Sequence, residues 1–470
     1  MRKTKIICTI GPASNSIEML EKLVDSGMNV ARLNFSHGSY ESHQMTIDNF
    51  KSVRRKSGKP ISLLLDTKGP EIRVGKFDSE SGYFLSKDST FILTTEEIIG
   101  NARRVSVSYK NLPNEVKEGH RIVIDDGKIE LRVVAIENNN VVCVVTAGGM
   151  ISNNKGVNIP YTHLNLPYLS QKDKDDIRFG VQNDVDFIAA SFVRTVEDVN
   201  AIRKFLNNIG GNDIKIISKI ENLEGIENFD SILEASDGIM IARGDMGVEV
   251  EFQKIPGIQK QFIKKCREVG KMVITATQML DSMAYNKMPT RAEITDVANA
   301  VFDGTSAVML SGETAMGKHP DLVVRVMSDI VVQAEKDFED YPVRYRSNAS
   351  NITNAICDAA CITASDLNAK CIVAVTQSGE TARLVSKYRP EELIVAPTPI
   401  KKTYNQLALS WGVYPILTTV QETEEDLIAN TLYEIKKAGY ADDGDVIVIT
   451  AGMPLSESGT TNLLKVVVVE

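Results

Sequence analysis

Eight short apolar runs, which with one exception begin about 20 to 35 residues apart, place the tightest limit on how this chain can fold. The stretches between most neighbouring runs carry apolar residues at helical spacing, as in SIEMLEKLVDSG (16–27). Strands and helices that alternate in this way predict an α/β fold built on an eight-stranded parallel (β/α)8 barrel, or TIM barrel. The runs are KIICTI (5–10), NVARLNF (29–35), ISLLLD (61–66), VDFIAASFV (185–193), IKIISKI (214–220), GIMIARG (238–244), MVITATQ (272–278) and SAVMLSG (306–312).

The gap between the third and fourth runs is far longer than one helix needs, and its pattern differs from the rest. Apolar and polar residues alternate there, as in RVSVSY (104–109), and turn sequences such as DDG (125–127) separate the alternating runs. We therefore predict a small β-barrel domain at 70–167, inserted into a barrel formed by 1–69 and 168–345. Loops that follow barrel strands lie at the catalytic face, so this domain would cover the site as a lid.

A third domain is predicted at the C-terminal end of the chain. After the polar stretch RYRSNASN (344–351), apolar runs such as CIVAVT (371–376) and DVIVIT (445–450) alternate again with helical segments. This pattern predicts a separate α/β domain over 346–470.

Composition excludes several classes of function. The net charge of −9 lacks the basic excess of nucleic-acid-binding and membrane-surface proteins. The six cysteines form no CxxC motif and the five histidines show no zinc spacing, so we interpret the cysteines as core thiols. The N-terminal apolar run is too short for a signal peptide or a membrane span, and we expect a cytoplasmic protein.

Two carboxylates and a lysine lie where two of the apolar runs end. Side chains two apart share a face of a strand, so Lys219 should point with Glu221, and Arg243 with Asp245. On neighbouring strands the two carboxylates could converge on one Mg²⁺, which typically takes one or two carboxylates plus phosphate oxygens. The alternative is a buried salt bridge between strand ends.

Further polar residues follow the other predicted barrel strands, which favours an active site over unrelated polar strand ends. Arg32 and Arg73 supply charge for phosphate or carboxylate oxygens. Another set offers four oxygen-bearing side chains with only one full charge, which suits a monovalent cation, although a hydrogen-bond network is an equally open interpretation. That set is Asn34, Ser36, Asp66 and Thr67.

Long motifs in a fixed order carry a resemblance to a known family over essentially the whole chain. They include TKIICTIGPAS (4–14), MNVARLNFSHG (28–38), LLDTKGPEIR (64–73), NKGVNIP (154–160), IISKIEN (216–222), DGIMIARGDMGVE (237–249), ITATQMLDSM (274–283) and PTRAEITDVANAVFDGTSAVMLSGETA (289–315). By these motifs the chain closely resembles pyruvate kinase. The resemblance implies transfer of the phosphoryl group of phosphoenolpyruvate to ADP, giving pyruvate and ATP, as the last step of glycolysis.

The resemblance also implies roles for individual residues. Lys219, Thr277 and Arg32 would be catalytic, and Thr277 would help to protonate the enolate. The implied substrate contacts are Arg32, Lys219, Gly244, Asp245 and Thr277. Magnesium (or Mn²⁺) would bind Glu221 and Asp245, and potassium would bind Asn34, Ser36, Asp66 and Thr67, with Glu71 marking the potassium-requiring branch. The implied nucleotide contacts are Asn34, Phe35, Ser36, His37, Arg73 and Lys155.

The resemblance further implies a homotetramer and a phosphorylated allosteric effector. Because the sequence ends at 470, we expect no additional C-terminal phosphohistidine-like domain. The turn TQSGET (376–381) precedes a helix and could bind an anion, although the sequence alone favours a plain turn between strand and helix. The implied effector residues are Thr376, Ser378, Gly379 and Thr381, with the loop SESGTTN (456–462) opposite. Glu380 disfavours fructose 1,6-bisphosphate and leaves the identity of the metabolite open.

Two other functions would use part of the same residues. A metal-dependent lyase or aldolase acting through an enolate would use Glu221 and Asp245 in the same way, but it has no need of the inserted domain, Arg73 or Lys155. A non-catalytic regulator on a degenerate kinase scaffold would be expected to lack Lys219 or a metal ligand, and all of these are present.

Overall fold

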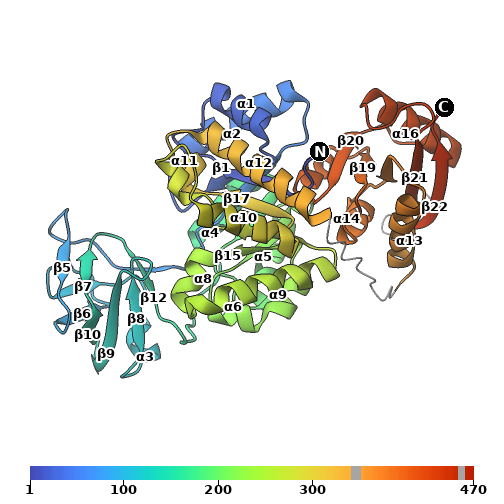
Figure 1. The fold of residues 1–470 in the computed structure, drawn as a ribbon. Helices are drawn as coiled ribbons and strands as arrows, with labels where there is room; N and C mark the ends of the chain where they lie inside the picture. The colour runs from blue at the N-terminus through green and yellow to red at the C-terminus, as the bar shows by residue number, and fades with distance from the viewer. Residues whose placement is uncertain (340–350, 454–460) are drawn as a thin grey trace.

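The computed structural model describes residues 1–339, 351–453 and 461–470, and a closed parallel barrel lies at its centre (Figure 1). All eight predicted barrel strands form, which confirms the predicted fold class. Their order around the barrel is β1-β17-β16-β15-β14-β13-β3-β2. The strands are β1 (Lys5–Thr9), β2 (Val30–Asn34), β3 (Ser62–Asp66), β13 (Phe187–Ala190), β14 (Lys215–Ile220), β15 (Gly238–Ala242), β16 (Met272–Ala276) and β17 (Ala307–Leu310).

Helices follow the barrel strands and pack around the outside (Figure 1). Several begin at side chains that accept a hydrogen bond from the first turn, as Ser16, Ser170 and Thr290 do. The helices are α1 (Ile17–Ser26), α2 (Tyr40–Ser57), α4 (Gln171–Gln182), α5 (Val196–Asn208), α6 (Leu223–Glu227), α7 (Phe229–Ala235), α8 (Arg243–Glu249), α9 (Ile255–Glu268), α10 (Arg291–Asp303), α11 (Gly312–Ala315) and α12 (Pro320–Glu339), with 3-10 turns η1 (Phe252–Lys254) and η2 (Asp281–Ala284).

The inserted segment forms a β domain that projects from one end of the barrel (Figure 1). Its main sheet has the order β4-β12-β8-β9-β10-β6-β7, and the bridge between Val74 and Val107 joins the two outer strands. Asp125 and Asp126 both have positive φ, which builds the predicted hairpin turn. The elements are β4 (Ile72–Arg73), β5 (Tyr83–Leu85), β6 (Thr90–Thr94), β7 (Arg104–Ser106), α3 (Leu112–Glu115), β8 (Arg121–Ile124), β9 (Ile129–Glu137), β10 (Asn140–Ala147), β11 (Gly149–Ile151) and β12 (Gly156–Asn158).

The C-terminal segment forms a five-stranded sheet of order β20-β19-β18-β21-β22, in which only β22 is antiparallel to its neighbour. The elements are α13 (Ile352–Asp366), β18 (Cys371–Ala374), α14 (Glu380–Lys387), β19 (Leu393–Thr398), α15 (Lys401–Gln406), η3 (Leu407–Leu409), β20 (Val413–Leu417), α16 (Glu424–Lys437), β21 (Val446–Gly452) and β22 (Thr461–Val468). The predicted boundary at 346 lies outside the described residues, and the boundaries at 70 and 168 stay predictions.

One local prediction was wrong. Arg243 and Asp245 were expected to share a face of a strand, but β15 ends at Ala242 and both residues belong to helix α8. Arg243 instead donates to Asp296 Oδ1 at 2.7 Å and to the carbonyl oxygen of Thr277 at 2.7 Å. Asp245 lines a different space, a cavity that it shares with residues of the inserted domain. On a helix, positions two apart point in different directions, so the two side chains separate.

The six cysteines are free thiols, five of them fully buried, as predicted for core residues. Burial raises the thiol pKa of Cys143 to about 12. Across the described residues we find no helix whose length and hydrophobicity would let it cross a membrane.

Lys5 is buried where the barrel meets the C-terminal domain. Its Nζ donates to the carbonyl oxygen of Val413 at 2.8 Å and lies 4.5 Å from the ring centre of Tyr414. Burial, with Arg2 nearby, lowers the pKa of Lys5 to about 7. The unfolded chain therefore binds the Lys5 proton between about pH 7 and pH 10, while the folded chain does not.

We expect this difference to make the unfolding free energy rise with pH from about 7 to 10, by at most about 1.4 kcal/mol per pH unit. Urea denaturation across that range should show the rise in the wild type and a flatter profile in Lys5→Met. Identical profiles for the two proteins would show that Lys5 does not titrate in this window.

Candidate active site

Lys219 lies at the centre of a buried cluster of charges at the carboxyl end of the barrel. Its Nζ is 3.0 Å from Glu221 Oε1 and 3.1 Å from Asp66 Oδ1, and it donates to Ser191 Oγ at 2.7 Å. Burial opposes protonation, but the carboxylates of Asp66 and Glu221 outweigh it and raise the pKa of Lys219. The residue is therefore a fixed ammonium group.

Glu221 and Asp245 come from different elements and interact electrostatically. Burial raises the pKa of Glu221 to about 7, opposed by Lys219 and reinforced by the Asp245 carboxyl group. Burial also raises the pKa of Asp245, and the acidic groups of Asp126 and Glu71 add to the effect. Buried carboxyl groups held together in this way favour a bound cation.

Asp66 connects Lys219 to Arg32. Its Oδ2 accepts from Arg32 Nε at 2.6 Å, and Arg32 also donates to Thr9 Oγ1 at 2.8 Å. Burial would raise the pKa of Asp66, but the two cations hold it below its usual range. The Asp66 carboxylate is therefore ionised, and it holds Arg32 and Lys219 in place at the carboxyl end of the barrel.

The four predicted potassium-binding residues come from adjacent strands. Register places Asn34 beside Asp66 on β2 and β3. Asn34 Oδ1 accepts from the Ser36 backbone, and Thr67 Oγ1 accepts from the Ser191 backbone at 3.2 Å. The side-chain oxygens of Asn34 and Thr67 thus accept hydrogen bonds within the protein, and a cation at this position would share them.

Thr277 follows strand β16 with φ of 70°, a conformation that is uncommon outside glycine. Its Oγ1 accepts from the backbone N–H of Gly244 at 2.8 Å, and Arg243 holds its carbonyl oxygen. Strained backbone of this kind clusters at functional sites. The predicted contacts Gly244 and Thr277 therefore lie together.

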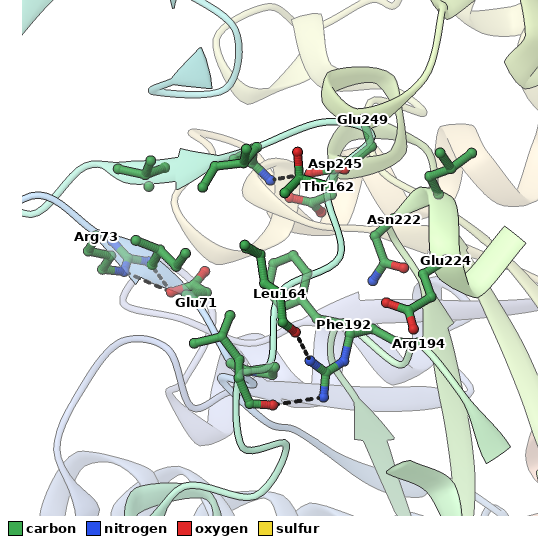
Figure 2. A pocket seen from close by; sticks show the side chains of 18 of the residues that line it. Glu71, Arg73, Thr162, Leu164, Phe192, Arg194, Asn222, Glu224, Asp245 and Glu249 are labelled. Carbon is green, nitrogen blue, oxygen red and sulfur yellow. Dashed lines mark hydrogen bonds and ion pairs between the residues drawn. The ribbon is translucent and has the colours of Figure 1, made fainter. Parts of the chain in front are cut away.

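A cavity of about 560 Å³ lies between the barrel end and the inserted domain (Figure 2). Four predicted residues line it: His37, Arg73, Lys155 and Asp245. Figure 2 shows Glu71 and Arg73 at one end and Asn222, Glu224 and Arg194 at the other. The cavity joins the metal-ligand candidate Asp245 to the cations predicted to bind nucleotide.

The two cations of this cavity that are predicted to bind nucleotide are held by neighbours from the inserted domain. Arg73 donates to Glu71 Oε2 at 2.7 Å and to the carbonyl oxygen of Asn154 at 2.7 Å. Lys155 Nζ lies 2.9 Å from Asp125 Oδ1. Both side chains remain partly exposed to the cavity, so an incoming phosphate could exchange for these partners.

Phe35 differs from the other predicted nucleotide contacts. Its side chain is buried and stacks on His43, with ring centres 4.0 Å apart. The ring is therefore a core group, and only the backbone of this residue could face a ligand.

The charged cluster is supported by a residue that the sequence did not single out. The backbone N–H of Phe192 donates to Glu221 Oε2 at 2.6 Å, and Phe192 has φ of 54°. No sequence pattern marks a phenylalanine whose backbone serves a carboxylate. Ser191, which follows β13, links Lys219 to Asp66 through its hydroxyl group.

Comparison with known proteins decides the family. The pattern of the pyruvate kinase barrel domain matches residues 1–324, and that of the pyruvate kinase alpha/beta domain matches residues 354–467. The chain belongs to the pyruvate kinase family. It is 49% identical to a pyruvate kinase of Clostridium acetobutylicum over the full length of both chains. It is 50% identical to one of Staphylococcus haemolyticus, covering 99% of this chain and 80% of the relative.

A solved pyruvate kinase structure from Cryptosporidium parvum has the same architecture, with a TM-score of 0.94 and 42% identity. The match covers all of this chain and 96% of the chain in the solved structure. Membership of the pyruvate kinase family makes the chain a phosphotransferase and an enzyme, as predicted. The same comparisons favour this family over the two alternatives, a lyase or aldolase and a non-catalytic regulator.

The predicted effector turn of this pyruvate kinase family member lies at the start of α14. Gly379 has φ of 83° and its N–H donates to Thr376 Oγ1 at 2.9 Å. Thr381 is buried and its hydroxyl pairs with Thr461 at 2.8 Å, while Ser378 is exposed. Residues 456–460 of the facing loop lie outside the described residues.

Proposed function

We propose that the chain transfers the phosphoryl group of phosphoenolpyruvate to ADP, the final reaction of glycolysis. The observation that carries this proposal is the buried Lys219 ammonium, which lies 3.0 Å from Glu221 and interacts electrostatically with Asp245. Asp245 in turn lines the cavity that also holds Arg73 and Lys155. In the reaction the bond between phosphorus and the enol oxygen breaks, and a bond to the terminal ADP oxygen forms. The enolate then takes a proton and becomes pyruvate.

Glu221 and Asp245 fit a divalent cation because both are buried oxygen donors whose pKa values are raised by burial. When bound, Mg²⁺ or Mn²⁺ would neutralise charge on the phosphoryl and enolate oxygens. Arg243 points to Asp296 rather than toward this pair, so its guanidinium does not compete with a cation there.

Lys219 is proposed to stabilise the charge that develops as the phosphoryl group moves, because its ammonium is fixed by two carboxylates before substrate arrives. Arg32, held by Asp66, would bind a substrate oxygen. The backbone N–H of Gly244 and the hydroxyl of Thr277 would contact substrate, and Thr277 would help to deliver the proton through water.

Potassium is proposed to bind near Asn34, Ser36, Asp66 and Thr67. The proposal is supported by the register that pairs Asn34 with Asp66 and by the presence of Glu71, as the family resemblance implies. Assays in which K⁺ is replaced by a larger organic cation should show depressed activity.

The direct test of the reaction follows pyruvate formation from phosphoenolpyruvate with ADP, Mg²⁺ and K⁺. We expect turnover that requires all four components. Turnover that persists without ADP, or the absence of pyruvate with every component present, would overturn the proposed reaction.

Arg73 and Lys155 are proposed to bind ADP, with backbone contacts from residues 34–37. We expect Arg73→Gln to raise the KM for ADP at least about tenfold and to leave the KM for phosphoenolpyruvate nearly unchanged, because it removes a charge-assisted contact. Arg103→Gln, an exposed change in the inserted domain outside the cavity, is the matched control. Equal changes in both KM values would assign Arg73 to another role.

We further propose that a phosphorylated metabolite binds at Thr376, Ser378, Gly379 and Thr381 and lowers the phosphoenolpyruvate concentration needed for half-maximal rate. The exposed Ser378 hydroxyl and the turn at the start of α14 support this. Sugar phosphates and nucleoside monophosphates should be screened for a shift of the saturation curve. Ser378→Ala should reduce the shift several-fold, and a screen without any shift would contradict the proposal.

A homotetramer and a cytoplasmic location complete the proposal. Exposed apolar side chains of the barrel, each at least 70% exposed, support subunit contacts, and the free thiols suit a reducing compartment. They are Phe252, Tyr285, Met288 and Met316. Light scattering coupled to gel filtration tests the subunit number.

A further inference from the structure

A small cavity lies at the junction between the barrel and the C-terminal domain, away from the active-site cavity. Its volume is about 20 Å³, enough for a water molecule or a single-atom ion. The end of α9 and the residues at the start of β16 and just before β17 form one wall, and α14 with the residues that follow α14 and η3 forms the other. We call it the junction cavity.

Five cations line the junction cavity, and no aspartate or glutamate among the described residues does so. Four of these cations donate to uncharged oxygens. Lys271 Nζ donates to the carbonyl oxygens of residues 233 and 234, Arg383 to that of Ser378, Lys387 to Asn354 Oδ1, and Arg389 to the carbonyl oxygen of Gly304. The fifth is Arg267.

Two side chains of the cavity also bury polar atoms that have no hydrogen-bond partner. Ser410 is only 2% exposed, and its Oγ is unpaired. Arg389 is held 4.3 Å from the ring centre of Trp411, and its Nε and Nη1 are buried and unpaired. Buried donors without partners are costly, and each is an indication of a missing acceptor.

Concentrated positive charge is costly at a buried junction as well. Burial lowers the pKa of Lys271, Arg383, Lys387 and Arg389, and carboxyl groups outside the cavity lining offset this effect only in part. An anion would compensate the charge and accept from the orphaned donors together.

We propose that the junction cavity binds a small inorganic anion, held by the Arg389 guanidinium and the Ser410 hydroxyl and surrounded by the other cations. A single-atom anion such as chloride fits the space as it stands. An oxyanion such as phosphate needs Arg383 or Lys387, whose long side chains are partly exposed, to move aside.

The site has a built-in reporter, because Trp411 is the only tryptophan of the chain and lines the cavity. The fluorescence of Trp411 should be followed while chloride or inorganic phosphate replaces gluconate at constant ionic strength. We expect a saturable change in the wild type. The concentration that gives half the change should rise at least about tenfold in Arg389→Gln and several-fold in Ser410→Ala, while Arg389→Lys should keep part of the response.

Arg55→Gln, an exposed change on α2 outside the cavity, is the control and should titrate like the wild type. If Arg389→Gln fails to fold, Ser410→Ala carries the test. Crystals soaked in bromide should show an anomalous peak beside Arg389 and Ser410. No saturable change in the wild type, or the same change in Arg389→Gln, would mean that the cavity holds water and would overturn the proposal.

Discussion

Lys219→Met is expected to lower the turnover number by at least about 10³-fold while phosphoenolpyruvate still binds. The ammonium group lies within 3.1 Å of Asp66 and Glu221, so it is positioned before substrate arrives and is poised to meet charge that develops in the transition state. Steady-state kinetics and a separate substrate-binding measurement, such as calorimetry, check the two halves of this prediction.

The variant also leaves two buried carboxylates without their shared cation, so its stability must be measured beside its activity. Lys215→Met is the matched control, because Lys215 lies on the same strand and pairs with Asp237 at 3.1 Å. We expect that control to keep nearly full turnover. If Lys219→Met folds normally and turns over like the wild type, the role given to Lys219 is wrong.

Glu221→Gln and Asp245→Asn are each expected to weaken Mn²⁺ binding by at least about 100-fold, because each removes a charged ligand rather than a supporting group. In Glu221→Gln the new amide oxygen can still accept the Phe192 N–H, so the fold should persist in that variant. Electron paramagnetic resonance of free Mn²⁺ during a titration measures the affinity.

Glu249→Gln is the control for general loss of negative charge. Glu249 belongs to the same helix as Asp245, lines the same cavity and accepts from Asn158 at 2.9 Å. We expect Mn²⁺ affinity within about threefold of the wild type for this variant. A loss as large as that of Asp245→Asn would show that the cavity attracts cations only through its overall charge.

Much of this architecture was predictable because the periodicity of apolar residues and the spacing of the apolar runs determine it. Each of the eight apolar runs is too short and too apolar for a surface helix, and each became a barrel strand. The turn at Asp125 and Asp126 was also predictable from the sequence, because aspartate tolerates the positive φ that a tight hairpin requires. The positions of Lys219 and Glu221 followed from where strand β14 had to end.

Other features depended on contacts that no local pattern carries. The start of helix α8 at Arg243 could not be read from RGDMGVE, since two glycines in seven residues argue against a helix. The backbone of Phe192 and the conformation of Thr277 depend on residues that follow other barrel strands, Glu221 and Gly244. The burial of Phe35 and the junction cavity around Arg389 likewise arise only when distant segments pack together.

The central claim is that Glu221 and Asp245 bind one divalent cation beside Lys219. Anomalous diffraction from crystals grown with Mn²⁺ tests it most directly. We expect one strong peak about 2.1 Å from an oxygen of each carboxylate. A peak bound to only one of the two, or no peak between them at saturating Mn²⁺, would contradict it.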